Sequence, residues 1–378
     1  MLNPDSATLG FKFPVMRPHL PTYLAIEPYL RELDANRWYT NFGPLVQKLE
    51  ARLARHYGAP AGSVCTMANA TLGIAAALQE AAAPKTGGVC LMPSWAFAAA
   101  AHAVVLSGLQ PLFVDVDPKT GQMTPAIAAA ALRADVAAVL VVSPFGQMVS
   151  PGPWEDFQRE SGVAVVIDAA AGFDTVSPSS LATVVSLHAT KPVGCGEGGF
   201  VLSTDASLIA RLHRRSNFGF DSRRCAVFAG LNAKMSEYHA AVAHASLDQW
   251  PVTRAHLMYV GRAYRERLTA VAEVQEGWAK TWISSTLNVR CRQPCNVASL
   301  VAQLARAGIE TRAWWGAGCH VQPVFEGYSR AALPATQETA RTTLGLPFFS
   351  QLSQRDVGTI VDRLACALRD SQSFEVVK

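Results

Sequence analysis

The sequence predicts a protein of the α/β class, with a large, mostly parallel sheet wrapped by helices. Segments typical of strands and of helices alternate between residues 63 and 204, as expected when parallel strands are joined through helices. Several strand segments, such as 163–167, are short and continuously apolar, as in strands covered on both faces. The 378 residues leave room for a second domain, so we expect a large domain over 1–250 and a small C-terminal α/β domain over 251–378.

The first half of the chain supports this class element by element. Helices are expected over 23–36 and 45–57, after an irregular, proline-containing start. Strands are then expected over 63–67, 89–92, 110–116 and 137–142. Helical segments separate these strands, beginning near residues 69, 98 and 125, and another surrounds residue 155.

The second half continues the alternation and then changes character. Strands are expected over 163–167, 183–187 and 200–203, followed by a basic helix over 206–217. Two long helices, over 235–250 and 254–274, are expected to lead out of the large domain. The small domain is then expected to hold a strand over 284–290, a helix over 297–307, a strand starting at 309–312 and a closing helix over 356–368.

Composition and charge exclude several classes of protein. Half of the residues are hydrophobic and 16% are charged, so the chain can bury a sizeable core. The formal net charge of +4 is small for this length and argues against a dedicated nucleic-acid-binding protein. We find no signal-like N-terminal stretch and no apolar run near the ~20 residues of a membrane span, so we expect a cytoplasmic protein without a membrane partner.

The eight cysteines are scattered along the chain. Cys291 and Cys295 form a CxxxC pair, but no second pair with metal-type spacing lies near them, so the spacing does not favour a structural zinc site. We therefore expect no metal ion, and free, mostly buried thiols as in a reducing compartment.

Two residues stand out for their chemistry. Asp168 directly follows the predicted strand at 163–167, and open α/β sheets bind their ligands at the carboxyl ends of strands. Lys191 lies 23 residues later between two predicted strands, followed by glycines at 194, 196, 198 and 199. A lysine amine can form a Schiff base with pyridoxal phosphate (PLP), and an aspartate can keep its pyridine nitrogen protonated, so that the ring works as an electron sink. A strand-end acid and an unrelated loop lysine are the alternative interpretation.

The segment SLHATKPVGCGEGG, which contains Lys191, resembles the lysine segment of the DegT/DnrJ/EryC1/StrS family of nucleotide-sugar aminotransferases. The resemblance extends over nearly the whole chain. It implies the aspartate-aminotransferase-like fold of PLP enzymes (fold type I), with Lys191 as the catalytic Schiff-base lysine and Asp168 as the partner of the pyridine nitrogen. Another subgroup of the family carries histidine in place of the lysine and catalyses dehydration, so Lys191 favours transamination.

The resemblance also implies further cofactor-binding residues. Ala70 and Thr71 match a small residue–threonine pair that holds the cofactor phosphate, and they open a predicted helix whose free N–H groups suit an anion. Ser186 matches a serine that contacts the same phosphate. Phe97 matches an aromatic residue that stacks on the pyridine ring, with Trp95 as the alternative.

Asn232 resembles an asparagine that reaches the cofactor phosphate of the neighbouring subunit, which implies a homodimer. Lys234 replaces the usual arginine of that motif. At Ala171 the sequence departs from the family, because many members have a glutamine or histidine there that contacts the cofactor ring. Residues 38–42 and 312–320 match segments near the substrate, and both a site role and a core role fit them.

The resemblance implies PLP-dependent transfer of an amino group from L-glutamate to a nucleotide-linked keto-deoxy sugar. Our first candidate is dTDP-4-keto-6-deoxyglucose, in O-antigen sugar biosynthesis, and a dTDP-3-keto-6-deoxyhexose is the near alternative. Another PLP enzyme of the same fold would need a mobile cysteine or a retro-aldol pocket, and a non-catalytic regulator should lack the Lys191–Asp168 pair. The sequence marks none of these features.

Overall fold

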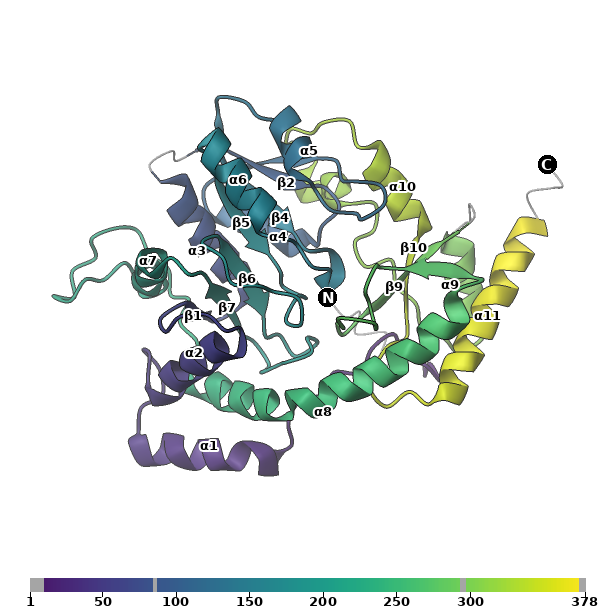
Figure 1. Cartoon of the computed structure of the whole chain (residues 1–378), viewed down its shortest axis with the longest axis horizontal. Coiled ribbons are helices and arrows are strands. Elements are labelled where there is room, and N and C mark those ends of the chain that lie inside the picture. The colour runs from purple at the N-terminus through teal and green to yellow at the C-terminus, as the bar shows by residue number, and fades with distance from the viewer. Residues whose placement is uncertain (1–9, 84–86, 293–296, 374–378) are drawn as a thin grey trace.

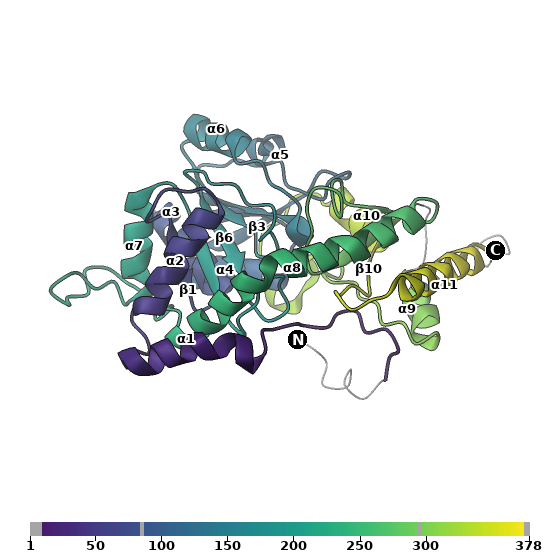
Figure 2. The ribbon, with the colours of Figure 1, turned by 60° about the horizontal axis from the view of Figure 1, so that its bottom comes forward.

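The computed structural model describes residues 10–83, 87–292 and 297–373. These residues form a large part built on a seven-stranded sheet and a smaller part built on a three-stranded sheet. One long helix, α8 (Glu237–Leu268), runs along both parts (Figures 1 and 2). The predicted α/β class is therefore confirmed.

Strands and helices of the large part alternate along the chain, as predicted. The strands are β1 (Val64–Met67), β2 (Val89–Pro93), β3 (Gln110–Val114), β4 (Val136–Val142), β5 (Ala164–Asp168), β6 (Ala182–Ser186) and β7 (Gly199–Leu202). The helices are α1 (Tyr23–Asn36), α2 (Pro44–His56), α3 (Ala70–Ala82), α4 (Ala98–Leu106), α5 (Pro125–Ala130), α6 (Gly152–Ser161) and α7 (Ala206–Ser216), with a short 3-10 turn η2 (Pro144–Gly146) after β4.

The large sheet has the strand order β1-β7-β6-β5-β4-β2-β3. All neighbouring pairs are parallel except those of β7, which is antiparallel to β1 and β6. Val142, Asp168 and Val184 are paired across β4, β5 and β6, so these strands reach the same edge of the sheet. We call it the carboxyl edge, and the loops that leave it carry the candidate site.

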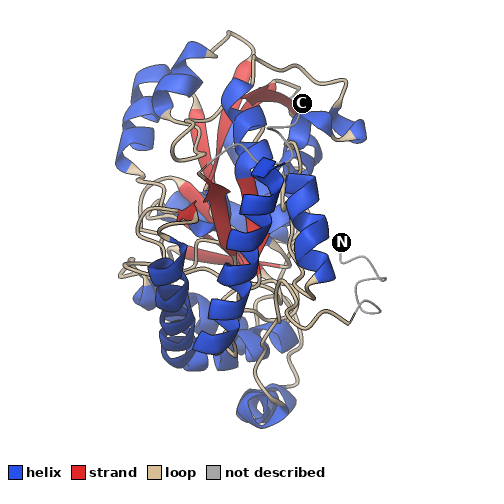
Figure 3. Cartoon of the chain, turned by 90° about the vertical axis from the view of Figure 1, so that its right-hand side faces the viewer, coloured by secondary structure: helices blue, strands red, loops and turns tan. Residues whose placement is uncertain are grey.

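Alternate strand residues supply two apolar layers, one on each face of the large sheet. In β4, Val139 and Val141 belong to the layer that contains Leu49 of α2, whereas Leu140 belongs to the layer that contains Ile74 of α3. Helices accordingly lie on both sides of the strands (Figure 3). This double cover explains why the strand segments are apolar along their whole length.

The small part contains an antiparallel sheet of order β10-β9-β8. Its elements are β8 (Ala272–Val274), β9 (Leu287–Cys291), α9 (Val297–Arg306), η3 (Cys319–Val321), η4 (Pro323–Phe325), α10 (Pro334–Thr342), β10 (Thr343–Leu346) and α11 (Gln354–Ser373). A segment from near the N-terminus joins it, because the Phe13 N–H donates to the Gly308 carbonyl at 3.0 Å and the Glu310 N–H donates to the Phe13 carbonyl at 2.9 Å.

Three expected features of the C-terminal half differ in the structure, and two of its elements were not expected. The two helices expected over 235–250 and 254–274 are one helix, α8, with Pro251 inside it, and the end of the second expected helix is strand β8. The segment 309–312 makes only isolated bridges, to Phe13 and Gly345, instead of starting a strand. Helix α10 and strand β10 were not predicted. The expected domain division at residue 250 falls inside α8 and stays a prediction.

Burial on both sides of Pro251 explains why α8 continues. A proline inside a helix costs about 3 kcal/mol because it removes a hydrogen bond and its ring clashes with the preceding turn. Trp250 before the proline and Leu257 and Tyr264 after it are all buried, and each such side chain contributes roughly 1.5–3 kcal/mol. Packing therefore outweighs the local penalty.

No helix in the described part of the chain is both long and apolar enough to cross a membrane.

Candidate active site

Lys191 lies in the loop between β6 and β7, at the carboxyl edge. Backbone hydrogen bonds fold this loop back on itself: Leu187 donates to the Gly198 carbonyl at 2.9 Å, and Ala189 donates to the Gly196 carbonyl at 2.8 Å. The Lys191 N–H donates to the His188 carbonyl at 2.8 Å, which makes a tight turn just before the lysine. The loop thus holds Lys191 half-buried on a fixed backbone.

Asp168 is the last residue of β5, and it interacts electrostatically with Lys191. Its side chain is 7% exposed, and its Oδ1 accepts a hydrogen bond from the Ala170 N–H at 2.9 Å. Burial raises the pKa of the Asp168 carboxyl to about 6, against the opposing effects of that hydrogen bond and of the Lys191 charge. Burial also lowers the pKa of the Lys191 amine, against the attraction of Asp168. A lysine with a lowered pKa has more of the neutral amine that a Schiff base requires.

The predicted phosphate-binding residues begin helix α3. The Asn69 side chain accepts from the Leu72 N–H at 2.9 Å, and the Asn69 carbonyl accepts from the Gly73 N–H at 3.2 Å. The first bond satisfies the Leu72 N–H, one of the groups that a helix leaves without internal partners at its start, and the second is the first bond within the helix itself. The N–H groups of Ala70 and Thr71 also lack internal partners, and they suit an anion.

Ser186 lies close to the start of α3. It is paired with Gly199 across β6 and β7, and a Cβ on Gly199 would lie 2.8 Å from the Ala70 nitrogen. Glycine at 199 therefore lets the strand approach the helix N-terminus. Ser186 is 6% exposed, and its hydroxyl accepts from the His188 N–H at 3.2 Å.

Asn232 is carried by a segment that runs beside the start of α3. The Ala68 N–H donates to the Ala233 carbonyl at 2.7 Å, and Asn232 forms a bridge with Asn217. The Lys234 ammonium donates to Asn232 Oδ1 at 2.8 Å. The structure thus places Asn232 next to Ala233, whose carbonyl is bonded to the segment that precedes α3.

Phe97 and Trp95, the two aromatic candidates after β2, have different surroundings. Phe97 is 56% exposed at the start of α4, whereas Trp95 is 3% exposed and packs edge-to-face against Trp315 and Phe145. A ring that already belongs to a packed cluster is poorly placed to stack on a ligand. The surroundings favour Phe97 over Trp95.

Side chains of the segment 312–320 are mostly engaged within the protein. Arg312 pairs with Glu310 at 2.8 Å, and its guanidinium lies over the Trp314 ring. Trp315 stacks on Phe145 with ring centroids 4.0 Å apart, and His320 Nδ1 lies 2.7 Å from the Ser94 hydroxyl oxygen. These contacts hold the small part against the loops after β2 and β4. Of the two roles that the sequence allowed for this segment, in the substrate site or in the core, they favour the core.

Glu237, the first residue of α8, is a supporting residue that sequence analysis did not single out. It is 1% exposed, and its two oxygens accept from the N–H groups of Leu45 and Val46, each at 2.8 Å. Its own N–H donates to the Tyr39 carbonyl at 3.0 Å. Glu237 therefore joins α8, α2 and the loop 38–42. An acid directly after the helix-capping Ser236 was the available sequence signal.

A cavity of about 180 Å³ lies between the two parts but is lined by other residues. Its lining includes Trp95 and Phe145 from the large part and Asn288 and Arg290 from β9. None of the predicted cofactor-binding residues is among the described residues that line it. The candidate active site is therefore defined by its side chains and backbone groups.

The residues present fit a PLP molecule. A half-buried lysine of lowered pKa and a buried aspartate interact at the carboxyl edge, and two free helix N–H groups and a serine lie in the same region. The Gly199 backbone keeps the approach to α3 open, since a side chain there would collide with the Ala70 nitrogen. Ala171 offers only a half-buried methyl group, as expected from its departure from the family.

Comparisons with solved structures agree with this assignment. A structure described as a putative PLP-dependent aminotransferase from Bacillus cereus has a TM-score of 0.88 and 30% identity, covering 93% of this chain and 99% of that chain. A structure of DesI in the presence of its TDP-sugar product has a TM-score of 0.85 and 32% identity, covering 97% of this chain and 96% of that chain.

Two sequence relatives have names that state a sugar substrate. The dTDP-4-amino-4,6-dideoxy-D-glucose transaminase of Shigella dysenteriae is 30% identical over 266 residues, covering 69% of this chain and 71% of the relative. The UDP-2-acetamido-2-deoxy-3-oxo-D-glucuronate aminotransferase of Pseudomonas aeruginosa is 27% identical over 325 residues, covering 84% of this chain and 89% of the relative.

The fold and its structural neighbours define a PLP-dependent aminotransferase. The chain matches the DegT/DnrJ/EryC1/StrS aminotransferase family over residues 25–365 and belongs to it. It is thus a sugar aminotransferase, as the lysine segment predicted.

Proposed function

We propose that this enzyme transfers the amino group of L-glutamate to a keto-deoxy sugar on a nucleoside diphosphate, with dTDP-4-keto-6-deoxyglucose as the first candidate. The name of the Shigella dysenteriae relative and the TDP-sugar product in the DesI structure support this substrate class. We place the reaction in the cytoplasm, in the synthesis of O-antigen sugars.

The interaction between Lys191 and Asp168 carries the proposal. PLP, when bound, supplies an electron sink for the electrons released when a proton leaves the donor carbon. Lys191 would hold the cofactor through its amine, and as a free amine it would take up and return the proton of the donor carbon. The Asp168 carboxylate keeps the pyridine nitrogen protonated.

The other predicted residues bind and orient. The N–H groups of Ala70 and Thr71 and the hydroxyl of Ser186 would hold the phosphate, and the exposed ring of Phe97 would contact the pyridine ring. His188 orders the lysine loop, because its Nδ1 lies 2.9 Å from the Thr190 hydroxyl oxygen and accepts from the Thr190 N–H at 3.2 Å.

The working unit in this proposal is a homodimer in which Asn232 reaches the partner's phosphate site. Exposed aromatic side chains on neighbouring segments support an interface there: Trp38, Tyr39, Phe218 and Tyr238 are 43–51% exposed. Aromatic residues are enriched in protein–protein interfaces.

A 3-keto sugar is the second candidate, because the name of the Pseudomonas aeruginosa relative states a 3-oxo substrate. A single-turnover assay separates the two candidates. Enzyme first aminated by L-glutamate is offered dTDP-4-keto-6-deoxyglucose, a dTDP-3-keto-6-deoxyhexose or a UDP-linked keto sugar, and the return of the visible cofactor absorbance is timed. We expect the dTDP-4-keto sugar to react at least about tenfold faster, a difference of ~1.4 kcal/mol in activation free energy. A faster reaction of another sugar would replace our candidate, and no reaction with any sugar would reject the substrate class.

A further inference from the structure

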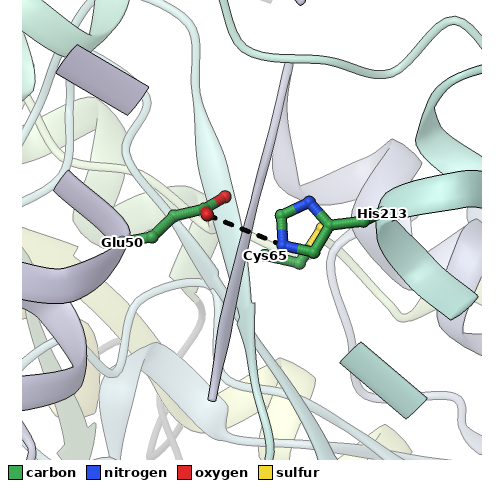
Figure 4. A group of neighbouring side chains, drawn as sticks. All are labelled: Glu50, Cys65 and His213. Atoms are coloured by element: carbon green, nitrogen blue, oxygen red, sulfur yellow. Dashed lines mark ion pairs between the residues drawn. The ribbon is translucent and has the colours of Figure 1, made fainter. Parts of the chain in front are cut away.

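A second group of polar side chains converges outside the residues proposed to hold the cofactor. It consists of Glu50 from α2, Cys65 from β1 and His213 from α7 (Figure 4). One ligand-type atom of each residue lies within 4.8 Å of those of the other two. Two consecutive elements, α2 and β1, and the distant helix α7 therefore direct an oxygen, a sulfur and a nitrogen toward one point.

These donor types form a ligand set that zinc uses in proteins. Zinc binds cysteine sulfur at about 2.3 Å and histidine nitrogen or carboxylate oxygen at about 2.0–2.2 Å, in tetrahedral geometry. Tetrahedral bonds of these lengths place the ligand atoms roughly 3.3–3.7 Å apart. Glu50 Oε2 and His213 Nε2, 3.5 Å apart, already have this spacing. The Cys65 sulfur has to approach them by at most about an ångström, which is within the reach of rotamer adjustment, and the fourth position is left to water.

The Glu50 carboxylate is already oriented as a metal ligand would be. Its Oε1 accepts hydrogen bonds from the Thr66 N–H at 2.8 Å and from the Thr66 hydroxyl at 2.9 Å. Its Oε2 is left to face His213 Nε2 at 3.5 Å. Hydrogen bonds that fix a ligating group in this way are a regular part of protein metal sites.

The other two ligands are also held in place. The His213 ring meets the Phe42 ring edge-on, with centroids 5.2 Å apart, and its side chain remains 30% exposed. Cys65 is fully buried, and its thiol makes a long hydrogen bond of 3.8 Å to the Thr66 carbonyl and also interacts with the Ser216 side chain. A structural tie between Glu50 and His213 would explain those two residues, but it gives no role to the sulfur beside them.

We propose that Glu50, Cys65 and His213 bind one zinc ion, which ties α2, β1 and α7 together. On binding, the Cys65 thiol proton leaves to solvent, and the thiolate and the carboxylate balance the two positive charges of the ion. The ion stabilises the frame behind the proposed phosphate site, because β1 leads into α3 and α7 leads to Asn217, which bridges Asn232.

The test uses the complete PLP-bound enzyme, stripped of metal with a chelator and titrated with zinc in a calorimeter. We expect one site per chain, and a zinc X-ray absorption spectrum with one sulfur at ~2.3 Å and nitrogen or oxygen neighbours at ~2.0 Å. Cys65→Ser, His213→Gln and Glu50→Gln should each weaken zinc binding at least about tenfold. Cys90→Ser, at another buried cysteine on strand β2 of the same sheet, is the matched control and should bind zinc as the unmodified enzyme does.

Two results would overturn the proposal. One is the absence of a zinc site, or a site whose spectrum shows no sulfur neighbour. The other is unchanged affinity in His213→Gln, which changes a partly exposed side chain and should fold even if Cys65→Ser does not. As a second measurement, zinc should raise the melting temperature of the unmodified enzyme and of Cys90→Ser, but not that of His213→Gln. An equal rise in all three would also reject the site.

Discussion

Two buried carboxylates of this chain have contrasting surroundings. Glu237 is 1% exposed, and both of its oxygens accept backbone N–H groups at 2.8 Å. Asp168 is 7% exposed, with one recorded hydrogen bond, and burial raises its pKa to about 6. Both oxygens of the Glu237 carboxylate, which joins helices, accept hydrogen bonds. The Asp168 carboxylate at the proposed active site has fewer such bonds, so its charge depends on a nearby cation. A buried carboxylate with too few hydrogen bonds to stabilise its charge thus indicates a role in catalysis, whereas a fully hydrogen-bonded one indicates a structural role.

The largest expected effect comes from the cation beside Asp168. Lys191→Ala should lower transamination by about 10⁴-fold or more, because the covalent attachment and the proton transfer are lost together. The protein should still fold and bind PLP. The glutamate half-reaction, followed by loss of the visible absorbance band, measures the effect, with Lys280→Ala at an exposed lysine as control. Near-normal turnover of Lys191→Ala would remove Lys191 from the mechanism.

Asp168→Asn should lower the rate of the glutamate half-reaction by about 10³-fold while the fold persists. An amide has no negative charge with which to keep the pyridine nitrogen protonated, so the ring loses its electron-sink character. Stopped-flow absorbance of the PLP-bound variant measures this rate. If the variant deaminated glutamate at the rate of the unmodified enzyme, the ring would have to lie elsewhere.

When PLP is absent, Asp168→Asn should make the folded protein more stable near neutral pH, although it slows the reaction. The folded pKa of Asp168, about 6, is above its ordinary value of 3.8, so between these values the folded state binds the proton more tightly. Stability from this group is therefore complete below pH ~4, is lost as pH rises through ~6, and stays lost above it. Asp168→Asn removes this loss, worth up to about 3 kcal/mol at pH 7.5. Urea unfolding of the cofactor-free proteins at pH 5 and pH 7.5 measures it, and parallel pH dependence of the two proteins would contradict it.

Glu237→Gln tests the structural role of the carboxylate that is hydrogen-bonded through both oxygens. A glutamine can accept from only one of the two helix N–H groups and directs an N–H₂ group at the other, so the variant should lose about 1–3 kcal/mol of stability. Its absorbance band from lysine-bound PLP should remain. Urea unfolding of the PLP-bound protein measures the loss, with Glu273→Gln at an exposed glutamate as control. A loss no larger than that of the control would place Glu237 among dispensable surface groups.

The smallest expected effect is the activity recovered when two different variant chains form one dimer. Lys191→Ala and Asn232→Ala proteins are unfolded and refolded together in equal amounts. If Asn232 acts in the partner's site, random dimers should restore about a quarter of the sites, since half of the dimers are mixed and one site of each is intact. Activity of the mixture against the two parents measures it. Activity that stays at the parents' level, with mixed dimers verified by mass, would confine Asn232 to its own subunit.

Residues close together in the sequence were the ones that sequence analysis placed well. The strands of the large sheet were predicted because both of their faces are apolar, and Lys191 and Asp168 lie on loops or ends of adjacent strands only 23 residues apart. Helix α3 was recognised because Asn69 caps it locally.

Long-range contacts account for what was missed. Glu237 contacts Leu45 across 192 residues, and Cys65 lies 148 residues from His213, so no local pattern marks either group. The continuation of α8 through Pro251 depends on burial that only the folded chain provides. Strand β10 forms by pairing with β9, and the paired residues lie more than fifty residues apart in the sequence.

The attachment of residues 13–15 to the small part has a consequence for synthesis. The Val15 N–H donates to Glu310 Oε2 at 2.9 Å, and the Phe348 N–H donates to the Val15 carbonyl at 3.1 Å. A ribosome adds about 5–20 residues per second, so roughly 20–70 s separate the synthesis of Val15 from that of Phe348. During most of that time the small-part residues that contact Phe13 and Val15 do not yet exist, although both residues are buried in the finished fold. These two apolar side chains therefore stay exposed on the nascent chain until the small part has been made.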